Sequence, residues 1–119
     1  MAKQWDLNKL AEFSQKQGRL STGEDRSGAK QDLLKTNNFS LAFICLEAGQ
    51  EIPPRPEPYG VCFYIISGKG VFSVGAERFE LTGGKMIYVP ADEARGIRSI
   101  ERLNLWGDSR PSLEKLAQP

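Results

Sequence analysis

Short runs of β-branched and aromatic residues, separated by glycine and proline, occupy most of the chain from residue 32 to residue 106. Such punctuated runs are typical of an all-β sandwich or barrel. They predict strands near 32–35, 39–46, 61–66, 70–74, 78–81, 85–89, 95–100 and 103–106. The fold class predicted from the pattern is therefore all-β.

Glycine and proline positions predict how these strands connect. The segment 67–70, Ser-Gly-Lys-Gly, is expected to form a tight hairpin, because glycine supplies the positive φ that such turns need. Gly75-Ala76 and Gly83-Gly84 are expected to form the next two turns. The segment 52–59 contains four prolines, which cannot all donate to a sheet, so it is expected at a sheet edge or as an extended loop.

The two ends of the chain have different patterns. Asp6 is a plausible N-cap for a short amphipathic helix over residues 6–15, ended by Gly18. Residues 17–31 are polar and glycine-rich, which predicts a connector or an arm laid on a partner. One or two helical turns are expected within 111–116. The predicted division is a helix and arm over 1–31, a barrel over 32–108 and a tail over 109–119.

Composition narrows the classes of function. The chain has 119 residues, 16 basic and 15 acidic, so it fits one domain and lacks the positive charge that non-specific nucleic-acid binding needs. No signal peptide and no membrane-spanning run is expected, which favours a cytoplasmic protein without a membrane partner. Cys45 and Cys62 lie in apolar runs without C-x-x-C spacing, which favours buried thiols.

Two spaced motifs identify a candidate family. Gly49, Gly68, Gly84 and Pro90 stand at intervals that match G-x5-H-x-H-x3-4-E-x6-G followed by G-x5-P-x-G-x2-H-x3-N. This framework resembles the cupin superfamily over about residues 33–106. The resemblance implies a small single-domain cupin with a double-stranded β-helix, or jelly-roll, barrel.

The metal-ligand positions of that framework hold other residues. Arg55, Glu57 and Val61 replace two histidines and a glutamate, Arg95 replaces the last histidine, and the chain has no histidine. A charged guanidinium has no lone pair to donate, and valine has no donor atom. With a four-residue spacing Cys62 would replace the glutamate, which still leaves fewer than three ligands. No metal or other cofactor is therefore expected, nor the metal-dependent isomerase, lyase or oxygenase chemistry usual in cupins.

The substitutes predict a small-molecule pocket, since alternate residues of a strand face the same side. Two arginines would bind the carboxylate or phosphate of an anionic organic ligand, and aromatic and aliphatic side chains would form the walls. The candidate ligand-binding residues are Arg55, Glu57, Val61, Phe63, Tyr88, Arg95 and Trp106. Alternatively, Glu57 bridges both arginines as a structural ion pair.

Three functions follow from these alternatives. The preferred one is a metal-independent binding protein, the second is an enzyme acting on a small carboxylate or sugar derivative, and the third is a ligand-free interaction module with a filled barrel. Cys62, Tyr64 and Ile66 alternate away from the pocket and need a cover, either the N-terminal helix with Trp5 or a second subunit. Because small cupins commonly pair, the resemblance together with this pattern favours a homodimer.

Overall fold

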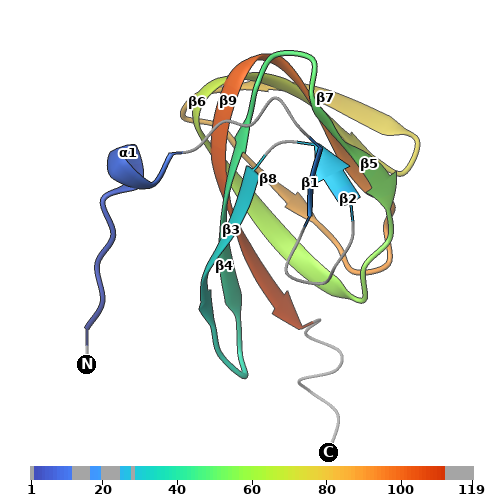
Figure 1. Cartoon of the computed structure of the whole chain (residues 1–119). Helices are drawn as coiled ribbons and strands as arrows, with labels where there is room; N and C mark the ends of the chain where they lie inside the picture. Colours follow the sequence, from blue (N-terminus) through green and yellow to red (C-terminus); the bar gives the residue numbers. More distant parts are fainter. Residues whose placement is uncertain (1, 12–16, 20–24, 28, 112–119) are drawn as a thin grey trace, which may run out of the picture.

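The computed structural model describes residues 2–11, 17–19, 25–27 and 29–111, and they form a barrel of antiparallel strands with one short helix (Figure 1). The expected C-terminal turns over 112–116 lie outside the described residues. The elements in chain order are α1 Leu7–Leu10, β1 Gln17–Arg19, β2 Asp25–Ser27, β3 Ala29–Lys35, β4 Ser40–Leu46, β5 Glu51–Arg55, β6 Tyr59–Val74, β7 Glu77–Thr82, β8 Met86–Val89 and β9 Arg95–Pro111.

Two faces of sheet enclose the core, and β6 and β9 belong to both. The first half of β6 pairs with β8 and with the second half of β9, which continues to β4 and β3. The second half of β6 pairs with β7 and with the first half of β9, which continues to β5. The predicted all-β jelly-roll architecture is confirmed.

The long strands correct one prediction. The segment 67–70 is not a hairpin, because β6 runs through it without reversing, and the predicted strands 95–100 and 103–106 are likewise parts of β9. The pairing of β6 with β9 shifts register between Ile65 and Gly70, which bends both strands from one face to the other. Gly68 has φ +92°, and a Cβ there would lie 2.0 Å from the Arg102 carbonyl oxygen. Gly68 is therefore needed because the backbones of β6 and β9 approach closely there. Local sequence does not distinguish such a close approach from a turn.

The other turn predictions are confirmed. Gly75, with φ +58°, lies between β6 and β7, and Gly84, with φ +89°, lies between β7 and β8. The proline-rich segment supplies β5, which pairs with β9 through a register shift between Ile52 and Arg55. Proline's missing N–H explains this sparse pairing at the sheet edge.

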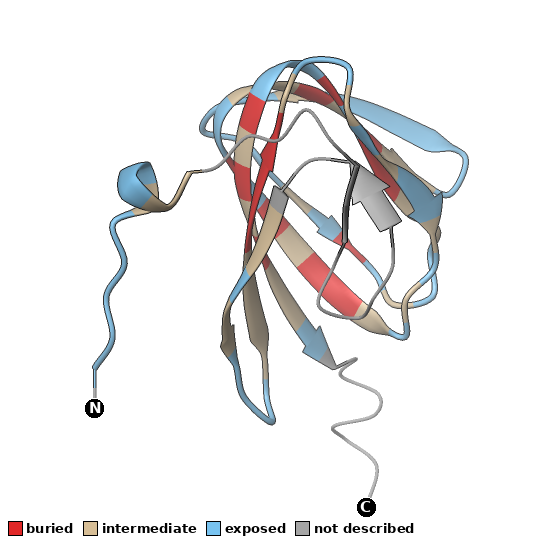
Figure 2. Ribbon diagram, in the orientation of Figure 1, coloured by how far each residue is buried: buried red, intermediate tan, exposed pale blue. Residues whose placement is uncertain are grey.

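The hydrophobic core lies between the two faces, where the inward residues of β4, β6, β8 and β9 meet (Figure 2). Leu46, Ile65, Leu103 and Leu105 are fully buried there, and Phe63 and Phe72 pack with ring centroids 5.9 Å apart. Alternation along β6 places Val61, Phe63 and Ile65 inside, as predicted. None of the described helices is long and apolar enough to cross a bilayer.

The N-terminal helix begins as predicted but is shorter. The Asp6 carboxylate accepts backbone N–H groups of Asn8 and Lys9, which confirms the N-cap. The helix ends at Leu10, because Ala11 already has extended backbone, and the rest of the predicted helix, 12–15, lies outside the described residues. Helix α1 buries no residue, and a short helix without packing has little reason to continue. Gln31 Nε2 donates to the Leu10 carbonyl and ties this segment to β3.

Candidate functional site

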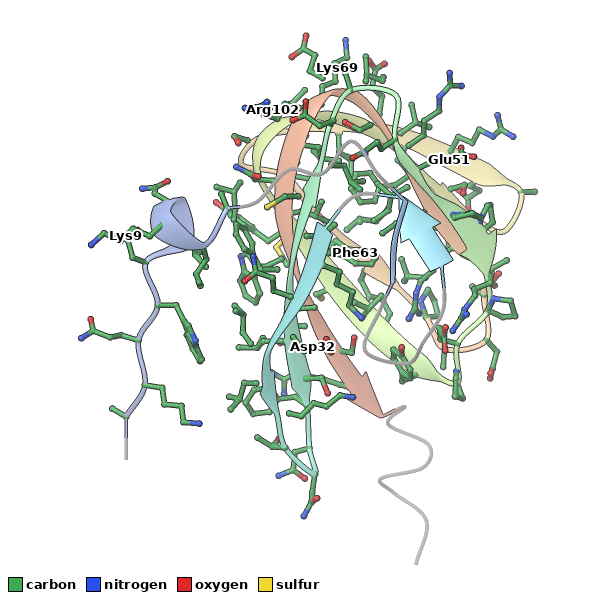
Figure 3. All side chains as sticks on the ribbon, viewed as in Figure 1. Lys9, Asp32, Glu51, Phe63, Lys69 and Arg102 are labelled. Carbon is green, nitrogen blue, oxygen red and sulfur yellow. The ribbon has the colours of Figure 1, made fainter. Side chains whose placement is uncertain are left out.

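A cavity of about 550 Å³ opens at one end of the barrel. Its described lining comes from β3, β4 and the connection between them, from β5 and the connection that follows it, and from parts of β6 and β9. Figure 3 shows Phe63 inside the barrel, and Lys69 and Arg102 at the end opposite the β3–β4 connection. The volume is in the range of small-molecule sites, so the described side chains leave open space at this end of the barrel.

Two arginines face each other at the mouth. Arg55 on β5 and Arg95 on β9 are direct cross-strand partners, and both line the cavity. Like charges directly opposite on a sheet repel each other. The Glu57 carboxylate partly compensates, since its Oε1 accepts from Arg55 Nε at 2.6 Å and Nη2 at 2.5 Å. Glu57 therefore binds Arg55, which is one of the two contacts predicted by the alternative in which Glu57 bridges both arginines.

Arg95 is held by Tyr59. Its Nη1 donates to the Tyr59 carbonyl at 3.1 Å, and its guanidinium carbon lies 4.9 Å from the centre of the Tyr59 ring. Burial raises the pKa of the Tyr59 phenol above its ordinary value, and the Glu57 carboxylate raises it further, while Arg95 and Arg55 partly offset this. Tyr59 is thus a neutral phenol at physiological pH, and its ring and carbonyl orient one cation at the mouth.

Positive charge predominates around the opening. Among the described residues that line the cavity, five side chains are cationic and two are carboxylates. The cations are Lys30, Lys35, Arg55, Arg95 and Arg110, and the carboxylates are Asp32 and Glu57. Three of these cations have carboxylate partners, since Lys30 lies 3.5 Å from Asp32, Arg110 lies 2.9 Å from Asp108 and Arg55 binds Glu57. The excess of positive charge is therefore small, and a positive field at a concave mouth favours anions.

Five of the seven predicted site residues line the cavity: Arg55, Glu57, Val61, Phe63 and Arg95. Tyr88 and Trp106 are not among its described lining residues and lie on the outer face of the sheet. Tyr88 is a cross-strand partner of Cys62 and is 62% exposed. Trp106 is a partner of Tyr64, with ring centroids 6.1 Å apart. Both residues were predicted on the wrong face of the sheet. Side chains alternate between the two faces along a strand, and because the neighbours Val89 and Leu105 face the core, Tyr88 and Trp106 face outward.

Several lining residues were not predicted from the sequence, although the strand alternation could have indicated one of them, Tyr59. Arg55, Glu57, Val61 and Phe63 share one parity, and the same alternation places Tyr59 between them. Lys30, Lys35, Ser109 and Arg110 also line the cavity. They come from β3, which folds over from a distant part of the chain, and from the end of β9, beyond the last predicted strand, so no local pattern indicated them.

The residues at the family's metal positions do not fit a metal ion. Of Arg55, Glu57, Val61 and Arg95, only Glu57 carries ligating atoms, and its Oε1 binds Arg55. Val61 belongs to the inner face while Cys62 pairs across the outer face with Tyr88 and Asp108, so Cys62 does not replace the lost ligand. No group of three histidine, cysteine, aspartate or glutamate side chains gathers within the described part of the chain.

Comparisons with known proteins agree with the motif framework. The cupin domain family matches residues 42–103, more than half of the chain, so the chain belongs to this family. An uncharacterized protein of Streptomyces coelicolor is 29% identical over 73 residues, which cover 61% of this chain and 70% of that protein.

Solved structures show the same fold. A Thermus thermophilus protein superposes with a TM-score of 0.76 at 22% identity, over 92% of this chain and 98% of the other. A conserved Streptococcus pyogenes protein of unknown function gives 0.75 at 19% identity, over 94% and 90%. At these identities the likeness extends to the cupin fold alone.

Proposed function

We propose that this cupin binds a small organic anion at the mouth of its barrel without a metal ion. The supporting observation is the direct cross-strand pair of Arg55 and Arg95 at the cavity, inside a lining richer in cations than in carboxylates. A ligand carboxylate or phosphate between the two guanidinium groups offsets their repulsion and accepts charge-assisted hydrogen bonds. The open cavity supports binding over a module with a filled barrel.

Binding can be tested by titrating the protein with small carboxylates and phosphate esters while following the melting temperature and the heat of binding. A ligand that binds only the folded state raises the melting temperature. Arg95→Ala and Arg55→Ala each remove a charge-assisted hydrogen-bond donor, which weakens binding by roughly tenfold to a hundredfold. Turnover of any of these compounds would assign the alternative, an enzyme.

Arg98→Ala is the matched control. Arg98 lies on β9 like Arg95 but is exposed and is not among the described lining residues. We expect Arg98→Ala to bind as the wild type does. Equal weakening in all three variants would mean that net charge and not the site is responsible, and no weakening in any would exclude the arginines as ligand-binding residues.

We also propose that the outer face of β6 and β8 pairs with a second copy of the chain. Tyr64, Ile66, Met86 and Tyr88 lie on this face and are 37%, 37%, 61% and 62% exposed. Cys62 and Trp106 share the face by register. These six side chains are uncharged, and Asp108, which lies opposite Cys62, is paired with Arg110, so two copies related by a two-fold axis can meet on this face with little repulsion.

The assembly can be tested by light scattering after gel filtration. We expect twice the mass of the chain for the wild type and the monomer mass for Tyr64→Arg, which places a charge inside the interface. Ile100→Arg is the control, since Ile100 is 42% exposed and lies between Ser99 and Glu101, whose partners Gly70 and Lys69 lie beyond the part of β6 that pairs with β8. A monomeric wild type would refute the dimer.

The cellular location that we propose is the cytoplasm. Cys45 and Cys62 are both free thiols, which suits a reducing compartment.

A further inference from the structure

The cavity has a charged mouth and an apolar floor. Its polar lining consists of the cations and carboxylates together with Thr36, Asn37, Asn38, Ser40 and Ser109, and the Lys30–Asp32 ion pair lies beside the apolar part, because these two residues are cross-strand partners of Ile44 and Ala42. The floor consists of Ala42, Ile44, Ile52, Val61, Phe63 and Ile97, of which Ile44, Val61, Phe63 and Ile97 are at most 8% exposed. No side chain of this floor can donate or accept a hydrogen bond. A ligand group that enters the floor must therefore be apolar, because an unpaired buried hydroxyl or amide is costly.

The walls beside the floor are flat. Gly96 and Gly107 line the cavity, and a Cβ on Gly107 would lie 3.0 Å from the Phe63 ring. The ring thus packs directly on the backbone of β9, and no side chain at residue 107 narrows the space next to it. The Phe63 ring itself fills the space beside Gly107, and Pro54 fills the space beside Gly96, so both glycines belong to the wall of the cavity.

We infer that the ligand is an organic acid with one carboxylate and an apolar body, of the aryl or branched-alkyl class, bound with its body on the floor and its carboxylate at Arg95 and Arg55. This inference rests on the proposed function and narrows it. It excludes sugars, sugar phosphates and inorganic anions as the preferred ligands, since they have no apolar part for the floor. Arg95 is oriented in advance by the Tyr59 carbonyl and ring, so little side-chain entropy is lost on binding.

Glu57 is the residue that limits affinity in this arrangement. Its carboxylate occupies Arg55 Nε and Nη2, the two donors on one edge of the guanidinium that a ligand carboxylate would use. The ligand has to displace Glu57 or bind beside its negative charge. Replacing the carboxylate with an amide keeps the side-chain shape and removes the competing charge, so Glu57→Gln is expected to bind organic acids more tightly.

The experiment measures the Kd of the full chain for phenylacetate, acetate, phenylacetamide and inorganic phosphate by calorimetry. Acetate and phosphate lack the body, and phenylacetamide lacks the charge. Because each buried CH₂-sized group contributes roughly fourfold in affinity, we expect phenylacetate to bind at least about tenfold tighter than acetate. Phenylacetamide should also bind at least about tenfold more weakly than phenylacetate, because it offers the arginines no charge. Nuclear Overhauser effects from the phenyl ring to the methyl groups of Val61 and Ile97 would place the body on the floor.

The outcomes separate this inference from the proposed function. If acetate or phosphate binds as tightly as phenylacetate, the mouth is an anion site, and only the inference is refuted. If phenylacetamide binds as tightly as phenylacetate, the site is an apolar pocket and the anion proposal fails. If none of the four probes binds wild type or Glu57→Gln, both are refuted.

The role of Glu57 has its own control. Glu51→Gln changes an exposed carboxylate on β5 that is not among the described lining residues. We expect Glu57→Gln to lower the Kd for phenylacetate by about twofold to fivefold, the effect of removing one partly exposed competing charge, and Glu51→Gln to leave it unchanged. Weaker binding or no change in Glu57→Gln would refute the competition by Glu57.

Discussion

Replacing Gly68 with alanine tests the close approach of the β6 and β9 backbones at the bend, on which the shape of the barrel depends. An alanine Cβ at residue 68 would lie 2.0 Å from the Arg102 carbonyl oxygen and 2.9 Å from the Leu103 Cα. Both atoms belong to the backbone of β9, so the strand itself has to move. Such overpacking costs about 1–3 kcal/mol, in addition to about 1–2 kcal/mol for a side chain at positive φ.

Gly84→Ala is a matched control for the positive φ alone. Gly84 has φ +89°, close to the +92° of Gly68, but a Cβ there has no atom within 4 Å. Gly84→Ala should therefore cost only about 1–2 kcal/mol. For a chain of this length, 1 kcal/mol lowers the melting temperature by roughly 4 °C, so we expect decreases of about 4–8 °C for Gly84→Ala and about 8–20 °C for Gly68→Ala.

The measurement is thermal unfolding followed by circular dichroism, together with urea titration at one temperature to obtain the free energy of unfolding. Unchanged urea dependence would show that the native state and not the unfolded state has changed. If the two variants lose the same stability, residue 68 lies in an ordinary turn, and the close approach of the β9 backbone to residue 68 is wrong.

Three further predictions follow from the core, the mouth and the surface. Leu105→Ala should lower the free energy of unfolding by about 2–5 kcal/mol, because Leu105 is fully buried, whereas Ile100→Ala at a 42% exposed position should cost far less; similar losses in urea titration would contradict the core assignment. An absorbance titration should show a component that ionises above the ordinary pKa of tyrosine, and Tyr59→Phe should abolish that late component. Because the pKa of Tyr59 is raised by folding, its contribution to stability is present below about pH 10 and is lost as the pH rises through the folded-state pKa. Lys69→Ala should leave the free energy of unfolding close to that of the wild type, since its pair with Glu80 is exposed to solvent; a clear loss of stability in urea titration would show that this pair is more than a surface contact.

Several features of the site were readable from local sequence. The alternation through Arg55, Glu57, Val61 and Phe63 predicted one inward-facing row, and the structure places all four at the cavity. The absence of histidine, together with the residues found at the ligand positions, argued against a metal site before any geometry was known. Both inferences depend on chemistry or on a two-residue period, which do not require knowledge of distant neighbours.

Other features depended on parts of the chain that are far apart in sequence. Tyr88 and Trp106 were assigned to the pocket because they are large and aromatic, but the register of β8 and β9 turns both outward. A one-residue shift in strand register moves every side chain of that strand to the opposite face. Composition does not determine the register, so it does not show which face a residue occupies. The convergence of Arg110 and Lys35 on the mouth similarly needed the pairing of β3, β4 and β9.

The amino-acid sequence alone determined the all-β class, the cupin framework and the absence of histidine, because glycine and proline positions and donor atoms are local properties. The tertiary structure decided that 67–70 continues a strand, that Arg55 stands directly opposite Arg95, and that Glu57 binds Arg55. The physical reason is that strand pairing is non-local. A glycine looks the same in a sequence whether it makes a turn or admits a neighbouring backbone, and only the packed barrel distinguishes the two.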